Sequence, residues 1–373
     1  MHRQCDEEKP QCRNCRIHNA ACVYGAVASR GAPHQPALLG PAGLSGQGEL
    51  PSFTLGQMEL LHHYTSSTAL TLSSNAQVRN MWQDRVPRLA LHADYVLDAF
   101  LAVSALHLAH LRPRARLSYW TMGVQLYQTA LGKAKLAMEH ISEENCTELF
   151  LFSTLTCFFS FAKNGDVAAR SARGDDVDNE EIDLLHWVFL FRGTRALLKP
   201  PYETAIKSGA LRTIIERGED RVRMLQAYSA AYAASVADEL RETVRNHVPD
   251  AAECEVYGDA VQLLQRSFHA VYSRQLERID TTDVFIWLFH VSDEYMDRLK
   301  TCEPPALAIF TCFSVLVQQL KGIWWAQDWG EWIARCLRDR LRDQERSLAD
   351  KLLEQLTLLD DRESQTVALS LAT

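Results

Sequence analysis

Four cysteines gather at the start of the sequence, and thiolates at such short spacings can hold a metal ion. They are Cys5, Cys12, Cys15 and Cys22, in the order Cys-x6-Cys-x2-Cys-x6-Cys. The residues between them are mostly polar or charged, so this segment cannot bury an apolar core of its own. Zinc bound by thiolates is tetrahedral in structural sites, and its binding supplies the folding free energy that the segment lacks. The spacing therefore predicts a zinc site at these four cysteines.

Disulfide bonds and unrelated free thiols are the alternatives to zinc. Disulfides form in oxidising compartments, and the charged N-terminus lacks the apolar stretch of a secretory signal. Unrelated cysteines are usually buried one at a time in a core, as we expect for the other six of the ten cysteines. Zinc is the interpretation that explains why four of them cluster.

The segment of residues 2–15, followed by six residues and Cys22, resembles the fungal binuclear zinc cluster (Zn2Cys6) of transcription factors. That family places six cysteines around two zinc ions, in two helical halves joined by a loop. The second half, with Cys12, Cys15 and Cys22, is complete here, whereas only Cys5 stands for the first half. The resemblance implies zinc as the cofactor, DNA as a partner and the nucleus as the location.

The missing half of the cluster bears directly on DNA binding. The family's first Cys-x2-Cys and most of its basic run would lie before Met1, and those residues normally place Lys and Arg on the DNA. The resemblance leaves Arg3, Arg13 and Arg16 as candidate DNA contacts. Residues 1–25 hold four basic and three acidic side chains, a formal charge of +1. Because counter-ion release scales with the number of phosphates contacted, we expect DNA binding by this truncated form to be weak or absent.

Three explanations of the missing half stay open. The sequence begins one exon late, or it is a natural form that has lost DNA binding, or its four cysteines hold a single zinc ion in an altered finger. We favour the first of these as a working hypothesis. An in-frame Cys-x2-Cys followed by basic residues upstream of Met1 would be its signature.

Length and charge limit what the rest of the chain can be. With 373 residues, it exceeds a typical single domain and suits one large domain with a small appendage. The net charge of −8 indicates that the body does not bind nucleic acid by itself, so DNA contacts must come from the N-terminus. The most apolar run, residues 149–162, is shorter than the ~20 residues of a membrane-spanning helix, so we expect no membrane span.

A linker and a helical body are expected after the cysteines. Residues 26–52 contain five glycines and four prolines with few bulky apolar residues, which predicts a flexible, disordered linker. From residue 53 onward apolar residues recur at helical spacing, and no stretch alternates as a strand would, so the fold class is all-α. Residues 94–111 are apolar almost all round, which predicts a helix at the centre of a bundle.

The remaining helix boundaries follow from periodicity, caps and breakers. We expect breaks at Val86-Pro87 and over residues 163–180, and a helix opened by Ser142 as its N-cap. The expected helices cover about 53–72, 94–111, 117–141, a stretch that contains 149–162, 182–198, 202–216, 221–247, 254–279, 284–300, 306–320 and 324–359.

Several of these helices resemble the regulatory domain of fungal zinc-cluster factors of the sterol-uptake-control type. The resemblance spans about Phe53 to Arg335, and its matching stretches are residues 58–64, 99–109, 144–153, 187–194, 305–309 and 324–330. It implies an all-helical regulatory domain over 53–360 that senses a hydrophobic ligand, sterol in the best-known members, or that transmits regulatory contacts. Many relatives of this kind control secondary-metabolite genes.

Few other residues of the body suggest a site. The aromatic residues that could line a pocket have helical spacing, which by itself predicts burial in the core; they are Phe100, Phe158, Phe159, Trp187 and Phe189.

Histidines and enzyme motifs offer no stronger chemistry. His107 and His110 lie three apart and His62 and His63 are adjacent, but the sequence supplies no third zinc ligand, so we expect core or surface histidines. There is no phosphate-binding loop, nucleophile elbow or His-Glu-x-x-His motif, and we therefore expect no enzyme.

The residues and the two resemblances together lead to one main hypothesis. The protein is a zinc-dependent, sequence-specific transcriptional regulator that acts in the nucleus on RNA polymerase II genes. Its expected targets are sterol or secondary-metabolite genes. Homodimerisation stays open because no heptad run follows the finger. The first alternative is a helical ligand-sensing or partner-binding protein that has lost DNA binding. A third, weaker hypothesis is a helical enzyme whose site the sequence does not reveal.

Overall fold

The computed structural model describes residues 53–172, 186–227, 234–272, 279–320 and 322–341, together with the short pieces 346–347, 350–351 and 353–354. The chain divides into two compact units after Ser52, and all of these residues belong to the second unit. The four cysteines of the predicted zinc site, the three arginines predicted to contact DNA and the predicted linker all lie outside the described residues.

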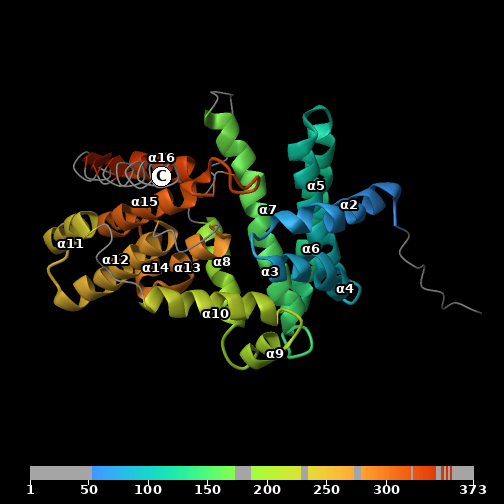
Figure 1. Cartoon of the computed structure of the whole chain (residues 1–373), viewed down its shortest axis with the longest axis horizontal. Helices are drawn as coiled ribbons and strands as arrows, with labels where there is room; N and C mark the ends of the chain where they lie inside the picture. The colour runs from blue at the N-terminus through green and yellow to red at the C-terminus, as the bar shows by residue number, and fades with distance from the viewer. Residues whose placement is uncertain are drawn as a thin grey trace, which may run out of the picture. The chain divides into compact units, whose positions relative to one another are not determined.

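Within the described residues every regular element is a helix, which confirms the all-α prediction (Figure 1). The longer elements are α2 (Leu55–Ser66), α5 (Asp94–Leu111), α6 (Arg116–Met138), α7 (Cys146–Ala172), α8 (His186–Leu197), α10 (Arg212–Ala227), α11 (Ala234–His247), α12 (Ala251–Tyr272), α13 (Thr281–His290), α15 (Pro304–Gln318) and α16 (Trp329–Arg340). Shorter helical pieces are η1 (Thr68–Thr71), α3 (Ala76–Asn80), the π-turn η2 (Met81–Arg85), α4 (Val86–Ala90), η3 (Pro113–Ala115), α9 (Glu203–Ser208) and α14 (Asp293–Lys300).

Helix α5 is the centre of the first group of helices, as its composition predicts. It packs against α2, α6 and α7, and nearly all its residues after Asp94 are buried. By length and composition α5 could cross a membrane, but 72% of its apolar window is buried inside the protein. It is therefore a core helix, and its apolar surface is covered by its neighbours.

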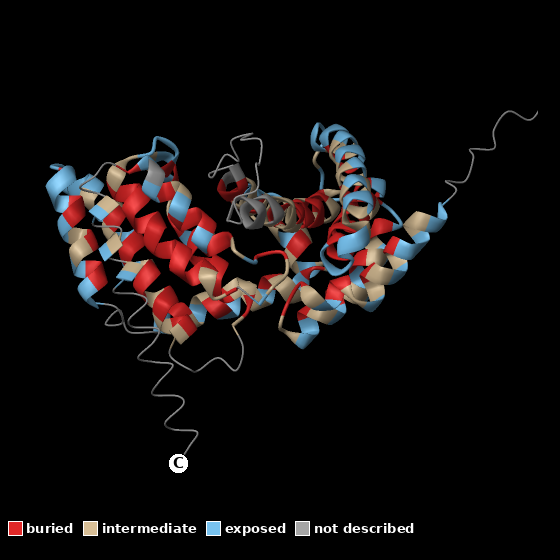
Figure 2. Cartoon of the chain, turned by 90° about the horizontal axis from the view of Figure 1, so that it is seen from above, coloured by how far each residue is buried: buried red, intermediate tan, exposed pale blue. Residues whose placement is uncertain are grey.

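Helix α15 has the same role among the later helices. It is buried from Pro305 to Val317 and packs on α16, α11 and α12. Figure 2 shows buried stretches of helix in red. Helix α16 approaches it closely at Gly330, where an added Cβ would lie 2.6 Å from the Gln318 amide nitrogen and 2.7 Å from the Ser314 carbonyl oxygen. Only glycine allows this approach of the two backbones.

Asp280 ties the start of α13 to the first group of helices. Its Oδ1 accepts from the Thr282 amide, and its Oδ2 accepts from the Ser73 hydroxyl at 2.8 Å and from the Ser74 hydroxyl at 2.7 Å. Burial alone would raise the pKa of Asp280, but these hydrogen bonds lower it to about 2. The carboxylate is thus an N-cap for α13 and a tertiary link at once.

The break expected at Val86-Pro87 is wrong. The chain stays helical from Ala76 to Ala90, passing through the π-turn η2 into α4. The π-turn η2 directly precedes Pro87, and its wider spacing accommodates a proline that removes one backbone hydrogen bond from the helical run.

Two expectations about α7 are also wrong. Ser142 does not cap it, because the Asn145 side chain accepts from the Ser142 amide in a turn and α7 begins at Cys146. The break expected over residues 163–180 does not begin at 163, because α7 continues to Ala172. Gly165 lies in this helix beside Trp329, and a Cβ added at Gly165 would lie 3.2 Å from the indole nitrogen.

Some expected helices divide where the sequence alone suggested continuity. The stretch 202–216 is split at Gly209 between α9 and α10, and 284–300 is split between α13 and α14 after His290. The last helix begins at Trp329, because Trp324 and Trp325 lie in the turns before it.

A candidate ligand pocket in the helical body

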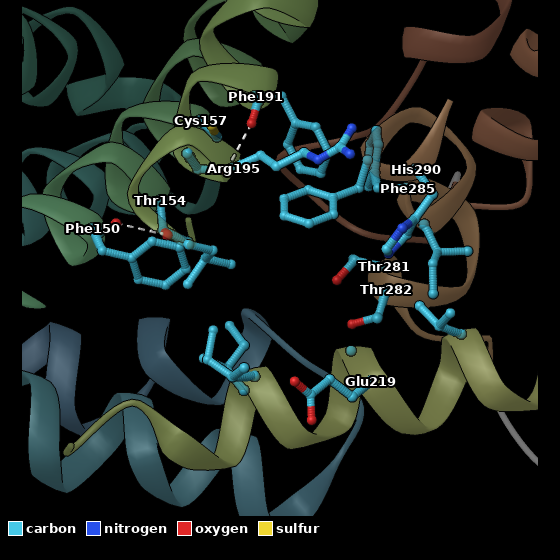
Figure 3. A pocket seen from close by; sticks show the side chains of 18 of the residues that line it. Phe150, Thr154, Cys157, Phe191, Arg195, Glu219, Thr281, Thr282, Phe285 and His290 are labelled. Atoms are coloured by element: carbon cyan, nitrogen blue, oxygen red, sulfur yellow. Dashed lines mark hydrogen bonds between the residues drawn. The ribbon is translucent and has the colours of Figure 1, made fainter. Parts of the chain in front are cut away.

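A cavity of about 460 Å³ lies between α7, α8, α10 and α13 (Figure 3). Helix α7 lines it with residues at positions 150, 154, 157, 158 and 161, which share one helical face. Helix α13 does the same with positions 281, 282, 285, 286, 289 and 290. The volume falls in the range of about 300–1,000 Å³ that is usual for small-molecule sites.

The walls of the cavity are mainly apolar. The aliphatic and aromatic side chains on its surface are Phe150, Phe158, Phe161, Phe191, Leu198, Ile214, Ile215, Val222, Phe285, Ile286, Phe289 and Trp325. Among them Phe161 lies 5.1 Å from Phe285 and 5.5 Å from Trp325, ring centre to ring centre. Such a surface favours an apolar ligand.

Two threonine hydroxyls in the walls are already bonded to carbonyls of their own helices. The Thr154 hydroxyl donates to the Phe150 carbonyl at 2.9 Å, and the Thr194 hydroxyl donates to the Phe191 carbonyl at 2.7 Å. The Trp325 indole N–H differs from them, because this buried donor has no hydrogen-bond partner in the described structure.

Three cations share one carboxylate at one end of the cavity. Asp293 pairs with Arg192, with Arg195 at 4.0 Å and with Lys199 at 3.8 Å. Partial burial would raise the pKa of the Asp293 carboxyl, but Arg192 and then Arg195 and Lys199 lower it. Arg195 and Lys199 line the cavity, so this end carries a surplus of positive charge.

Arg192 holds the end of α13 in place. Its side chain is only 7% exposed, and its Nη1 donates to the carbonyls of Leu288, Phe289 and Val291 at 3.3, 2.9 and 2.8 Å. The last carbonyls of a helix have no intrahelical donor, so the guanidinium acts as a C-cap supplied by another helix. Burial lowers the pKa of Arg192, although the Asp293 carboxylate opposes this.

Two carboxylates share one ammonium at the opposite wall. The Lys207 ammonium lies 2.7 Å from a carboxylate oxygen of Glu203 and 2.7 Å from one of Glu219. Figure 3 shows Glu219 on α10, across the cavity from Arg195. The Glu219 carboxylate is thus matched by a neighbouring ammonium.

Two further lining residues are uncharged at neutral pH. Burial, with Arg195 and Arg192 nearby, lowers the pKa of His290 to about 4, so its ring is neutral at pH 7. Burial raises the pKa of the Cys157 thiol to about 12, so it is no thiolate nucleophile.

The aromatic residues considered in the sequence divide as follows. Phe158 lines the cavity, whereas Phe100, Phe159 and Trp187 are buried in the core. The side chain of Phe189 lies outside the described residues. Sequence reasoning missed Arg195 and Lys199, and their signal was the repeat of basic residues on one face near the end of α8.

The histidines form a structural cluster. His63 Nε2 lies 3.3 Å from His107 Nδ1, and the Thr68 hydroxyl lies 3.0 Å from that nitrogen. The His107 ring stacks on Trp324 at 4.6 Å, and burial lowers its pKa to about 4. In the part of the chain that the structure describes, no three His, Cys, Asp or Glu side chains could together hold a metal ion. His62 and His110 are exposed.

Comparison with known proteins connects both parts of the chain to one kind of protein. The family described as Fungal Zn(2)-Cys(6) binuclear cluster domain matches residues 1–30, and the family described as Fungal specific transcription factor domain matches residues 59–213. A protein of Gibberella zeae named Zn(2)-C6 fungal-type transcription factor is 26% identical over 294 residues, 73% of this chain and 55% of that protein. The chain therefore spans about half the length of this relative.

A second relative is the Zn(2)-C6 fungal-type transcription factor afumD of Aspergillus fumigatus. It is 25% identical over 314 residues, which are 82% of this chain and 79% of that protein. These matches confirm the resemblance to Zn2Cys6 transcription factors, and the cluster match implies zinc binding. The donor set fits zinc, since thiolate sulfur is a preferred zinc ligand, although four cysteines stand where the two-zinc cluster has six.

Proposed function

We propose that this chain, which belongs to the fungal Zn2Cys6 family of transcription factors, is a zinc-dependent, sequence-specific regulator of transcription by RNA polymerase II. The observation that carries the proposal is the order of the two family matches, a cysteine-rich segment followed by a regulatory domain in one chain. A regulator of this kind acts in the nucleus and is not an enzyme.

Three segments of the chain have separate roles in this regulator. Residues 1–25 bind zinc and DNA, residues 26–52 are a flexible linker, and residues 53–360 are the helical regulatory domain. The whole chain has a formal charge of −8 and residues 1–25 have +1, so the remainder stands at −9. Because DNA is a polyanion, this distribution assigns DNA contact to the N-terminal segment alone.

In the N-terminal segment Cys5, Cys12, Cys15 and Cys22 are the proposed zinc ligands. Bound zinc would supply the folding free energy of a segment that has no apolar core. Arg3, Arg13 and Arg16 are the proposed DNA contacts, since guanidinium groups bind phosphates and guanine edges.

The cavity gives the regulatory domain a place for a hydrophobic ligand. Its largely apolar wall and its volume of about 460 Å³ support binding of a sterol-like or other apolar small molecule. Occupancy of the cavity would stabilise the body by mass action and so report the ligand to the regulator. Sterol genes or secondary-metabolite genes are the proposed targets, and a homodimer is the proposed assembly on DNA.

A second candidate function is a helical ligand-sensing or partner-binding protein that has lost DNA binding. The observation that favours it is the formal charge of only +1 over residues 1–25, which offers few phosphate contacts. Such a protein would bind its ligand in the same cavity.

Zinc content and DNA binding together separate the two candidates. The purified chain is analysed for zinc and titrated at several salt concentrations with duplexes selected from a randomised pool. The regulator predicts bound zinc, a preferred sequence, and a salt slope that falls by ~1 in R13Q, which removes one phosphate contact. R335Q, in an exposed side chain of α16, is the matched control and should change nothing.

A chain without zinc, or one with only sequence-blind and steeply salt-dependent binding, would rule out the regulator in this form. Ligand binding that survives in that chain would then support the second candidate.

A further inference from the structure

We infer that the cavity between α7, α8, α10 and α13 binds an amphipathic carboxylic acid, with its apolar part in the cavity and its carboxylate on Arg195 and Lys199. The inference rests on the proposed role of this cavity as the regulator's ligand site. It narrows the ligand from any apolar molecule to one that carries a single negative charge.

The apolar part follows from the walls. Aromatic and aliphatic side chains from four helices surround the space, and the threonine hydroxyls on α7 and α8 are bonded to their own helices. A chain or ring of carbon atoms therefore meets few unsatisfied polar groups away from the positive end. Burial of such a group is favourable in proportion to its apolar area.

Arg195 supplies the donors for a carboxylate. An arginine side chain carries five N–H donors, but the contacts of Arg195 among the described residues are long. Its Nη1 lies 3.4 Å from the Val291 carbonyl oxygen and 4.0 Å from Asp293. Its side chain is 30% exposed and lies in the cavity wall, near Phe191 in Figure 3.

The charges around Arg195 favour an anion at this end. Asp293 is shared by Arg192, Arg195 and Lys199, so one carboxylate faces three cations. Arg192 is occupied by three helix carbonyls, which leaves Arg195 and Lys199 to meet a ligand. A carboxylate has the planar geometry that a guanidinium binds with two parallel hydrogen bonds.

The opposite wall would not attract the same group. There Lys207 stands between Glu203 and Glu219, so the local balance is negative. The neutral His290 ring adds no positive charge at pH 7. The cavity is thus positively charged at the Arg195 end and not at the opposite wall. This difference orients an acid with its carboxylate at Arg195 and disfavours a cation there.

A neutral sterol or alcohol would bind in the cavity with lower affinity than an acid. It would cover the Arg195 guanidinium without supplying an acceptor of matching charge, and a covered donor without an acceptor costs free energy. An ester of the same acid has the same apolar part but lacks the charge. Acid and ester therefore form a matched pair of probes.

The test measures binding of saturated acids of 8–16 carbons, their methyl esters and ergosterol to the full chain, by calorimetry and by thermal shift. We expect affinity to rise about fourfold per added methylene until the cavity is full. We expect the acid to bind about tenfold more tightly than its ester, because only the acid forms charge-assisted hydrogen bonds with Arg195 and Lys199. Solvent exposure of these two side chains weakens such bonds and keeps the factor from being larger.

Variants locate the carboxylate. R195Q should bring the ratio of acid to ester affinity close to one, and K199Q should lower it by about threefold. R212Q, in an exposed residue of α10 that does not line the cavity, is the control and should keep the ratio. The melting temperature of each variant without ligand shows whether it has folded.

Equal affinity for acid and ester in the unaltered chain, an unchanged ratio in folded R195Q, or no binding across the whole series would overturn the inference. Tight ergosterol binding with no preference for acids would also overturn it, while leaving a neutral ligand for the proposed regulator. The zinc and DNA measurements test that regulator separately, so the two failures are distinguishable.

Discussion

Replacing Arg192 by methionine tests whether a guanidinium from α8 caps α13. The substitution keeps an unbranched apolar stem of similar length but removes every N–H donor and the charge. It strips the hydrogen bonds from the carbonyls of Leu288, Phe289 and Val291. Asp293 keeps Arg195 and Lys199 as neighbours, so the main loss is at the helix end.

The cost can be estimated from these contacts. A hydrogen bond from a charged donor contributes about 1.5–3 kcal/mol, and three bonds to one group are not additive. Removing a buried charge recovers part of its desolvation cost, in keeping with the lowered pKa of Arg192. We therefore expect R192M to lower the free energy of unfolding by about 3 kcal/mol, and R192K by about half as much because one ammonium can still reach a carbonyl.

Urea unfolding of the full chain, followed by tryptophan fluorescence and by circular dichroism, measures the effect. The midpoint should fall without a change in slope, and the melting temperature should fall by roughly 5–10 °C. R212M is the control, since Arg212 forms an exposed pair with Glu216 and should matter by less than about 0.5 kcal/mol. If R192M is as stable as R212M, water satisfies these carbonyls and the capping argument is wrong.

Three further predictions concern other parts of the chain. Because the pKa of Asp280 is depressed to about 2 from 3.8, its stabilisation is present above about pH 4 and is lost as the pH falls towards 2. D280N should cost about 2 kcal/mol at pH 7 and flatten that acid limb in urea titrations, and an unchanged limb would contradict the role of the carboxylate. G330A should destabilise the fold by about 1–3 kcal/mol in the same assay, whereas G258A, with open space for a Cβ in α12, should be neutral or stabilising; equal effects would contradict the close packing of α15 and α16. C12S should abolish zinc binding measured by metal analysis, whereas C302S, in an exposed cysteine, should keep the full zinc content; retention of zinc by C12S would exclude the proposed ligand set.

The all-α class and several helix ends could be predicted because their signals are local. The run from Asp94 to Leu111 is apolar on every face, and the observed α5 has those same bounds. Prolines after Leu111 and Leu198 stop the chain from continuing as a helix, as expected. The cysteine spacing, likewise local, indicated the family before any fold was known.

Other boundaries depended on packing that no local signal contains. Pro87 is accommodated within a helical run because a π-turn precedes it. Gly165 stays helical where α7 meets Trp329, a residue 164 positions later in the chain. Such contacts outweigh the modest helix propensity of single residues.

The sequence by itself determined the periodic helices, the excess of acidic residues in the body and the cysteine segment, because each of these is a property of neighbouring residues. Only the tertiary structure decided where the cavity lies and what its charge is. Arg195 and Asp293 are far apart in the chain and come together only when α8 packs on the end of α13. A site built from side chains of four helices depends on how those helices pack, and packing is a property of the whole core.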